Sequence, residues 1–145
     1  MQGEMNFKTP RQKKEWESTR PHSNLRLVVA DAVVMMHRLG WTPLVTSVWR
    51  SAAEERRLNS SGVHNAWRAI DIRTRDVDAR LVDDLERYLN EAWIYDTART
   101  RLPVAYAALH GDGPHIHIQV TDRTQRRGTE RELRQDATRW PVEPR

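Results

Sequence analysis

Hydrophobic residues recur at intervals of three and four in two long segments of the chain. This spacing predicts amphipathic helices over residues 24–39 and 76–92, each with one buried stripe, and Gly40 ends the first. The first stripe consists of Leu25, Val28, Val29, Ala32, Val33, Met36 and Leu39, and the second of Val77, Leu81, Leu85, Tyr88, Leu89 and Ala92. A short charged helix is also expected over residues 52–58, capped by Ser51.

Short segments rich in β-branched or apolar residues predict four strands. They cover residues 42–48, 69–72, 103–109 and 115–120. In the last strand the isoleucines share one face, and His115 and His117 share the other with Gln119, because strand side chains alternate. Helices and strands do not alternate regularly, and a tight turn joins the last two strands. The sequence therefore predicts an α+β fold, with a small antiparallel sheet and helices packed on one face. The open face is expected to carry Asp71 and the two histidines.

The length of 145 residues fits one domain. We expect a loosely ordered polar lead-in over residues 1–22, the domain itself over 23–121, and a polar, Arg-rich extension over 122–145 that packs on the domain. The longest apolar stretch, Leu27 to Met36, is interrupted by Asp31 and is too short to span a bilayer. No signal peptide is visible. We expect a soluble monomer, made in the cytoplasm and without a membrane span, that acts on a cell wall if it is exported or released.

The composition narrows the chemistry that is available to the chain. There is no cysteine, so any metal site must use histidine and carboxylate ligands. The net charge of +4 and the pI of about 9.9 favour anionic polymers such as nucleic acid, anionic lipid or an acidic cell wall, without choosing among them.

The strongest candidate ligands are His64 and Asp71, which six residues separate, followed later in the chain by His115-Ile116-His117. Asp71 lies between two isoleucines, where an unpaired carboxylate is costly, so it needs a cation, several donors or a metal ion. Three such ligands and one open position are typical of catalytic zinc. Asp71 could instead pair with Arg68 or Arg73, and both later histidines could be solvated.

Two further residues are candidates for chemistry. Asp112 stands three positions before His115, where a carboxylate can face a metal site, although Gly-Asp-Gly-Pro is also a turn sequence. Arg50 lies between an apolar strand and a helix, where a guanidinium can hold a carbonyl or carboxylate. It could also be an ordinary surface arginine.

Three segments, in this order, resemble the zinc D-Ala-D-Ala metallopeptidases. They are Thr46-Ser-Val-Trp-Arg50-Ser51, Gly62-Val-His64-Asn-Ala-Trp67-Arg-Ala69-Ile-Asp71 and Asp112-Gly-Pro-His115-Ile-His117. The family pattern is an aromatic-Arg-Ser segment, then Ser-x-His-x-x-Gly-x-Ala-x-Asp, then an acid or histidine shortly before a final zinc histidine. The family includes D-alanyl-D-alanine carboxypeptidases and the L-alanyl-D-glutamate endopeptidases of bacteriophage endolysins. It shares its fold with the hedgehog signalling domain.

The resemblance implies that His64 and Asp71 are the first two zinc ligands. The third is His117 if the ending follows the His-x-His members, and His115 if it follows the Asp-x-Pro-His members; we favour His117, with His115 beside the metal. Asp112, or alternatively His115, would be the base that activates water, and Arg50 would hold the scissile carbonyl. We therefore expect a zinc peptidase that cleaves the peptide stem of bacterial peptidoglycan, either a phage-type endolysin or a cell-wall hydrolase.

Two positions depart from the family pattern, since Gly62 replaces a serine and Trp67 replaces a glycine. Alternatives within the fold are a D-Ala-D-Ala carboxypeptidase and a non-catalytic phage structural module. The His-hydrophobe-His strand also resembles that of rolling-circle DNA nickases, for which Tyr88 or Tyr95 would be the nucleophile. Nickases do not account for His64 and Asp71 at their spacing, so we do not expect nucleic acid as a partner.

Overall fold

The computed structural model describes residues 4–58, 61–109 and 113–128, which form four helices and seven short strands. In chain order the elements are β1 (Asn6–Phe7), α1 (Pro10–Glu17), α2 (Ser23–Arg38), β2 (Leu44–Ser47), α3 (Ala52–Arg57), β3 (Ala69–Arg73), α4 (Ala79–Ala92), β4 (Trp93–Ile94), β5 (Ala105–Ala108), β6 (His115–Gln119) and β7 (Gln125–Arg126). The predicted α+β class is confirmed.

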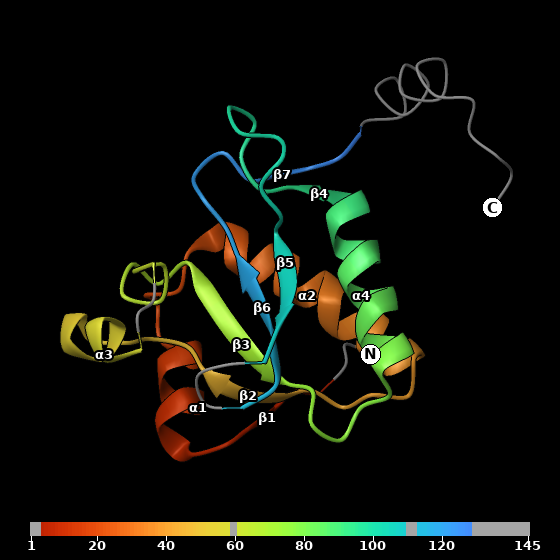
Figure 1. The fold of residues 1–145 in the computed structure, drawn as a ribbon. Helices are drawn as coiled ribbons and strands as arrows, with labels where there is room; N and C mark the ends of the chain where they lie inside the picture. Colours follow the sequence, from red (N-terminus) through yellow and green to blue (C-terminus); the bar gives the residue numbers. More distant parts are fainter. Residues whose placement is uncertain (1–3, 59–60, 110–112, 129–145) are drawn as a thin grey trace, which may run out of the picture.

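Five strands form the main sheet in the order β1-β2-β3-β6-β5 (Figure 1). The four strands predicted from the sequence pair antiparallel, and β1 adds to the edge parallel to β2. The sheet is therefore mixed rather than antiparallel throughout. The difference arises in the N-terminal lead-in, which forms β1 and α1 although we expected it to be loosely ordered. The amide of Asn6 donates to the carbonyl of Pro43, and that of Lys8 to the carbonyl of Val45, each at 2.8 Å.

The two long helices, α2 and α4, contribute to one hydrophobic core with the sheet (Figure 1). Both begin at a capping residue: His22 accepts from the amide of Asn24, and Asp78 accepts from the amide of Arg80. Alternation along β3 and β6 directs their isoleucines into this core, where each buried side chain contributes about 1.5–3 kcal/mol. Fully buried isoleucines are Ile70, Ile72, Ile116 and Ile118. The other face of these strands is left for polar residues.

A second, two-stranded sheet consists of β4, which directly follows α4, and β7. It is linked to α2 by Asp31, which interrupts the apolar sequence of that helix. The carboxylate of Asp31 accepts from Tyr88 Oη at 2.8 Å, Trp93 Nε1 at 2.9 Å and Arg126 Nη1 at 2.7 Å. The predicted packing of the C-terminal extension beyond residue 128 falls outside the described residues. Within the described ranges, no helix has the length and apolar character needed to cross a membrane.

Candidate metal centre

The central strands β3 and β6 bring two of the expected ligands together. Asp71 stands directly opposite His117 in the antiparallel register. Because Ile70 and Ile72 enter the core, the side chain of Asp71 faces the opposite side of the sheet, together with His117. Both are buried, with exposed fractions of 2% for Asp71 and 5% for His117. This face thus carries the residues that strand alternation predicted for it, although Asp71 and His117 are buried rather than open to solvent.

His64 reaches the same place from the turn that precedes β3. The turn contains Gly62 and Trp67, with φ of 91° and 61°, and the amide of Trp67 donates to the carbonyl of His64 at 3.1 Å. A positive φ suits glycine but strains a residue with a side chain. Trp67 stacks on Trp49 at a centroid distance of 5.8 Å, which offsets part of this strain. Trp67 stands where the family that the sequence resembles has glycine, and its backbone has a conformation that suits glycine.

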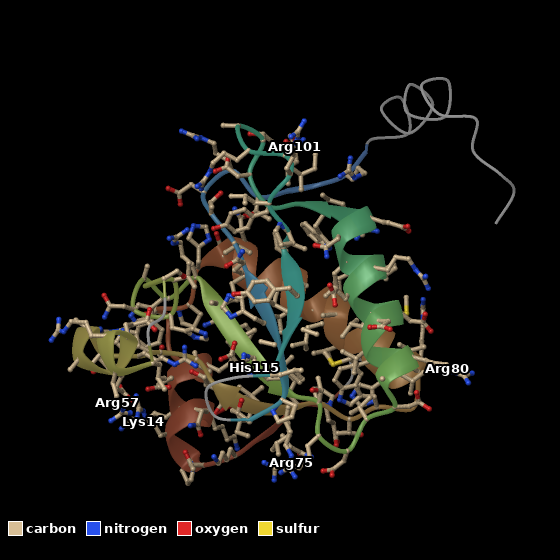
Figure 2. All side chains as sticks on the ribbon, viewed as in Figure 1. Lys14, Arg57, Arg75, Arg80, Arg101 and His115 are labelled. Atoms are coloured by element: carbon tan, nitrogen blue, oxygen red, sulfur yellow. The ribbon has the colours of Figure 1, made fainter. Side chains whose placement is uncertain are left out.

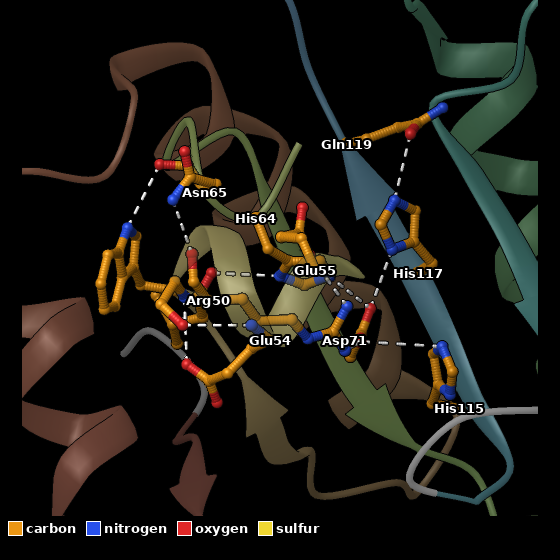
Figure 3. A network of polar contacts seen from close by, with 12 residues as sticks. Arg50, Glu54, Glu55, His64, Asn65, Asp71, His115, His117 and Gln119 are labelled. Carbon is orange, nitrogen blue, oxygen red and sulfur yellow. Dashed lines mark hydrogen bonds and ion pairs between the residues drawn. The ribbon is translucent and has the colours of Figure 1, made fainter. Parts of the chain in front are cut away.

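Two histidines converge on one carboxylate oxygen (Figure 3). Nε2 of His64 lies 3.2 Å from Oδ1 of Asp71, and Nδ1 of His117 lies 2.8 Å from the same atom. One possible ligand atom from each of the three residues lies within 4.8 Å of the others, and all three residues are buried. This His64–Asp71–His117 group could hold a metal ion.

Each of the two imidazoles has an inner ring nitrogen, which contacts Asp71, and an outer ring nitrogen, which makes a hydrogen bond elsewhere. Nδ1 of His64 contacts the carbonyl of Val48 at 3.1 Å, and Nε2 of His117 contacts Oε1 of Gln119 at 3.0 Å. The amide of Gln119 is itself oriented, because its Nε2 donates to the carbonyl of Pro103 at 3.0 Å. Both outer partners are acceptors, so the hydrogen-bond network assigns the ring protons to the outer nitrogens. In neutral rings the inner nitrogens then present lone pairs to the carboxylate.

Three electron-pair donors that face one another repel unless a proton or a metal ion lies between them. Protonation of both buried imidazoles is one way to satisfy the group, and a divalent ion is the other. Two imidazoles and one carboxylate form a ligand set used by zinc, and an acceptor on the outer nitrogen of each ligating histidine is the usual arrangement around such a site. The described residues therefore fit a bound divalent ion.

The carboxylate of Asp71 is ionised in this setting. Burial by itself raises the pKa of Asp71, but the charge of His64 and the hydrogen bonds from His117 and His64 outweigh it. Together they hold the pKa of Asp71 well below its ordinary value. These contributions apply when the imidazoles are protonated, which is the metal-free way of satisfying the group.

Arg50 lies beside the group, but it contacts Asp71 directly. Its Nη2 donates to Oδ2 of Asp71 at 2.8 Å, and its Nη1 lies 3.6 Å from Oε1 of Glu55. Only 9% of Arg50 is exposed. The arginine that pairs with Asp71 is thus neither Arg68 nor Arg73, the two considered from sequence, and Arg50 is not a surface arginine. Its expected role toward a substrate carbonyl stays a prediction.

His115 lies next to the group without joining its closest contacts. Its Nε2 is 3.7 Å from Oδ2 of Asp71. Its Nδ1 contacts the carbonyl of Gly113 at 2.8 Å, so Nδ1 carries a proton, and in a neutral ring Nε2 keeps a lone pair. Asp112, the other expected base, lies outside the described residues, and its role stays a prediction.

Three side chains near the group had no role assigned from sequence. Gln119 was placed on the histidine face but not linked to His117. Tyr106 pairs with His117 across β5 and β6, and their ring centroids are 4.8 Å apart; its place in a strand was the available signal. Glu55 is 5% exposed although it lies in a charged segment, which gives no signal of burial.

The tyrosines proposed for a nickase are engaged elsewhere. Tyr88 donates to Asp31 on α2, and Tyr95 is a buried member of the hydrophobic core. Basic side chains are also dispersed: of the five that Figure 2 labels, two share one side of the view and the other three lie elsewhere, so these do not form one patch. Lys14 and Arg57 share the one side, and the other three are Arg75, Arg80 and Arg101.

In comparisons with known proteins, no family model, no curated protein and no solved structure matched the chain. What the protein does is therefore inferred from its residues and their geometry.

Proposed function

We propose that the chain is a zinc-dependent peptidase that cleaves the peptide stem of bacterial peptidoglycan. It would belong to the D-Ala-D-Ala metallopeptidases with the hedgehog-type fold, in the branch of the phage endopeptidases. The observation that carries the proposal is the convergence of His64 and His117 on Oδ1 of Asp71, with the inner ring nitrogens free to act as ligands. The order of the three sequence segments supports the same family.

The ion would be held by Nε2 of His64, a carboxylate oxygen of Asp71 and Nδ1 of His117. When bound, zinc would supply a Lewis acid that activates water and polarises a carbonyl group. The carbonyl of Val48 and the side chain of Gln119 would hold the imidazoles in the required tautomers.

The residues beside the group could transfer the proton of the attacking water and stabilise the negative charge on the carbonyl oxygen. The free Nε2 of His115 can accept a proton from an attacking water and later return it to the leaving amine. Asp112 is the alternative base. Arg50 would stabilise the negative charge that develops on the carbonyl oxygen, through donors that Asp71 does not use.

The substrate class follows from the family resemblance and agrees with the charge of the chain. A net charge of +4 favours association with an anionic wall, and added salt would weaken this attraction. The sequence motifs favour an endopeptidase over a carboxypeptidase, because Asp112 matches the carboxylate of the endopeptidase branch.

The test is hydrolysis of purified peptidoglycan, followed by the release of new amino groups and by mass spectrometry of the products. The wild type should be active and should lose activity with a chelator and in His117→Ala. His37→Ala is the matched control, because His37 contacts the carbonyl of Glu4 rather than the metal group. Activity that survives both the chelator and His117→Ala would refute a metallopeptidase. Free D-alanine as the sole product would identify a carboxypeptidase.

A non-catalytic metal-binding module is the second candidate, and the position of Arg50 favours it. Its two terminal nitrogens face Asp71 and Glu55, and 10% of its side chain is exposed. If one equivalent of zinc binds but no wall fragment is hydrolysed, this second candidate replaces the peptidase.

A further inference from the structure

A buried acid lies beside the metal group, and the described residues offer it no hydrogen bond. Glu55 on α3 is 5% exposed, and among the described residues neither of its carboxylate oxygens has a hydrogen-bond partner. Its ion-pair contact is with Arg50, at 3.6 Å, which is too long for a hydrogen bond. A buried carboxylate in this state is costly, so its presence calls for a physical reason.

The position of Glu55 follows from where α3 begins. Arg50 is followed at once by Ser51, which caps the helix through a capping box with Glu54. Glu55 comes about one helical turn after Ser51, which brings its side chain back toward Arg50. Gly62 packs on the far side, where a Cβ would lie 3.8 Å from Oε2 of Glu55. The carboxylate is thus enclosed between the arginine and the turn that carries His64.

Arg50 therefore lies between two buried carboxylates but is bonded to one of them (Figure 3). It is 2.8 Å from Oδ2 of Asp71 and 3.6 Å from Oε1 of Glu55. Shortening the second distance to about 2.9 Å, a normal hydrogen bond, needs only a small movement of the guanidinium.

A divalent ion in the His64–Asp71–His117 group would repel the guanidinium that shares the Asp71 carboxylate. We infer that Glu55 is a positioning residue that receives Arg50 when a metal ion occupies this group. Asp71 then directs its charge to the ion, and Arg50 stays beside the site, held by Glu55. This inference rests on the metal binding in the proposed function and adds a role for a residue outside the ligand set.

Loss of the Glu55 charge should weaken metal binding, because Arg50 would then have no alternative anionic partner and would compete with the ion for Asp71. We expect Glu55→Gln to lower zinc affinity by about 10- to 100-fold, as changes behind metal ligands typically do. Glu54→Gln is the matched control, because it removes the same charge from the same helix. Glu54 bonds to Arg11 and to the amide of Ser51, and glutamine can still accept from that amide.

Zinc affinity would be measured by chelator competition for the wild type and both variants, with circular dichroism to show that each is folded. A second measurement needs no variant: a crystal structure of the zinc-loaded wild type. It should show Arg50 hydrogen-bonded to Glu55 and farther from Asp71 than 2.8 Å.

Equal affinities in Glu55→Gln and Glu54→Gln would overturn the inference while leaving the metal site in place. So would a loaded structure in which Arg50 still bonds to Asp71 and Glu55 has no partner, whatever the affinities. Failure of the wild type to bind zinc would overturn the proposed function and this inference with it.

Discussion

His117 and Asp71 face each other directly across the pairing of β3 with β6, and Nδ1 of His117 lies 2.8 Å from Oδ1 of Asp71. The backbone register therefore sets this contact, and the choice of ring nitrogen follows from the hydrogen bond between His117 and Gln119. His115, two positions earlier, is 3.7 Å from the other oxygen of Asp71. The two histidines should consequently differ in their importance for metal binding.

We expect His117→Ala to lower zinc affinity by more than about 100-fold and His115→Ala by less than about 10-fold, since removing a ligand costs more than removing a neighbour. Isothermal titration or chelator competition would measure both. The reverse order of effects would identify His115 as the third ligand.

Gln119 should matter for zinc affinity because it accepts from the outer nitrogen of His117. Gln119→Leu removes this acceptor and should weaken zinc binding by about 10- to 100-fold. Gln119→Glu keeps an oxygen at the same place and should bind zinc at least as well as the wild type. If the leucine and glutamate variants bind zinc equally, the outer hydrogen bond has no role in tuning His117.

The backbone at Trp67, with φ of 61°, predicts an unusual order of variant stabilities. Both Trp67→Gly and Trp67→Ala lose the stacking on Trp49, but only alanine keeps the left-handed strain. The glycine variant should be more stable than the alanine variant by about 1 kcal/mol, since the strain of about 1–2 kcal/mol is partly offset by the entropy of glycine. Urea unfolding of the two variants would measure this difference. An alanine variant as stable as the glycine variant would argue against strain at this position.

Glu54 predicts a pH dependence of stability. The hydrogen bond from the amide of Ser51, followed by that from Arg11, lowers the pKa of Glu54 from 4.5 to about 2. Because the folded-state pKa is depressed, this stabilisation is complete above the ordinary pKa and is lost as the pH falls toward about 2. Glu54→Gln lacks the charge at every pH.

The difference in unfolding free energy between the wild type and Glu54→Gln should therefore be largest near neutral pH and shrink below pH 4.5. Urea unfolding at a series of pH values would show this. A difference that stays constant down to about pH 3 would mean that the charge of Glu54 does not contribute.

The spacing of apolar residues along the sequence was sufficient to predict the helices and strands at the centre of the fold. The apolar stripe predicted a helix over residues 24–39, and α2 covers Ser23–Arg38. The second helix was expected from residue 76 but begins at Ala79, because Asp78 caps it. Alternation in β6 separated the isoleucines from the histidines, as the structure has them.

The short edge elements were missed for a physical reason. β1 and β7 have two residues each, too few for a pattern, and their pairing depends on distant partners. β1 is defined by the carbonyls of Pro43 and Val45, and the position of β7 is supported by the bond of Arg126 to Asp31. Such contacts are set by the tertiary structure and leave no local signal.

The candidate site was likewise predictable where it depends on local sequence and not where it depends on tertiary packing. The spacing of His64 and Asp71 and the later histidine pair pointed to a shared centre, because strand geometry determines where Asp71 and the later histidines lie and His64 stands in the turn just before β3. The bond between Arg50 and Asp71 and the burial of Glu55 depend on how α3 packs against the sheet. The sequence of α3, with two acids and two bases among six residues, does not contain that information.

The location of Asp71 in the middle of a paired strand determines which length changes the chain can tolerate. Segments added in the loops between residues 73 and 115, outside α4, β4 and β5, would leave the register of β3 and β6 unaltered, so these loops are free to diverge in size. A single residue inserted within β3, just before Asp71, would turn the carboxylate toward the core and bring an isoleucine to the outer face. Natural indels in relatives of this protein should accordingly accumulate in the first region and be absent from the second.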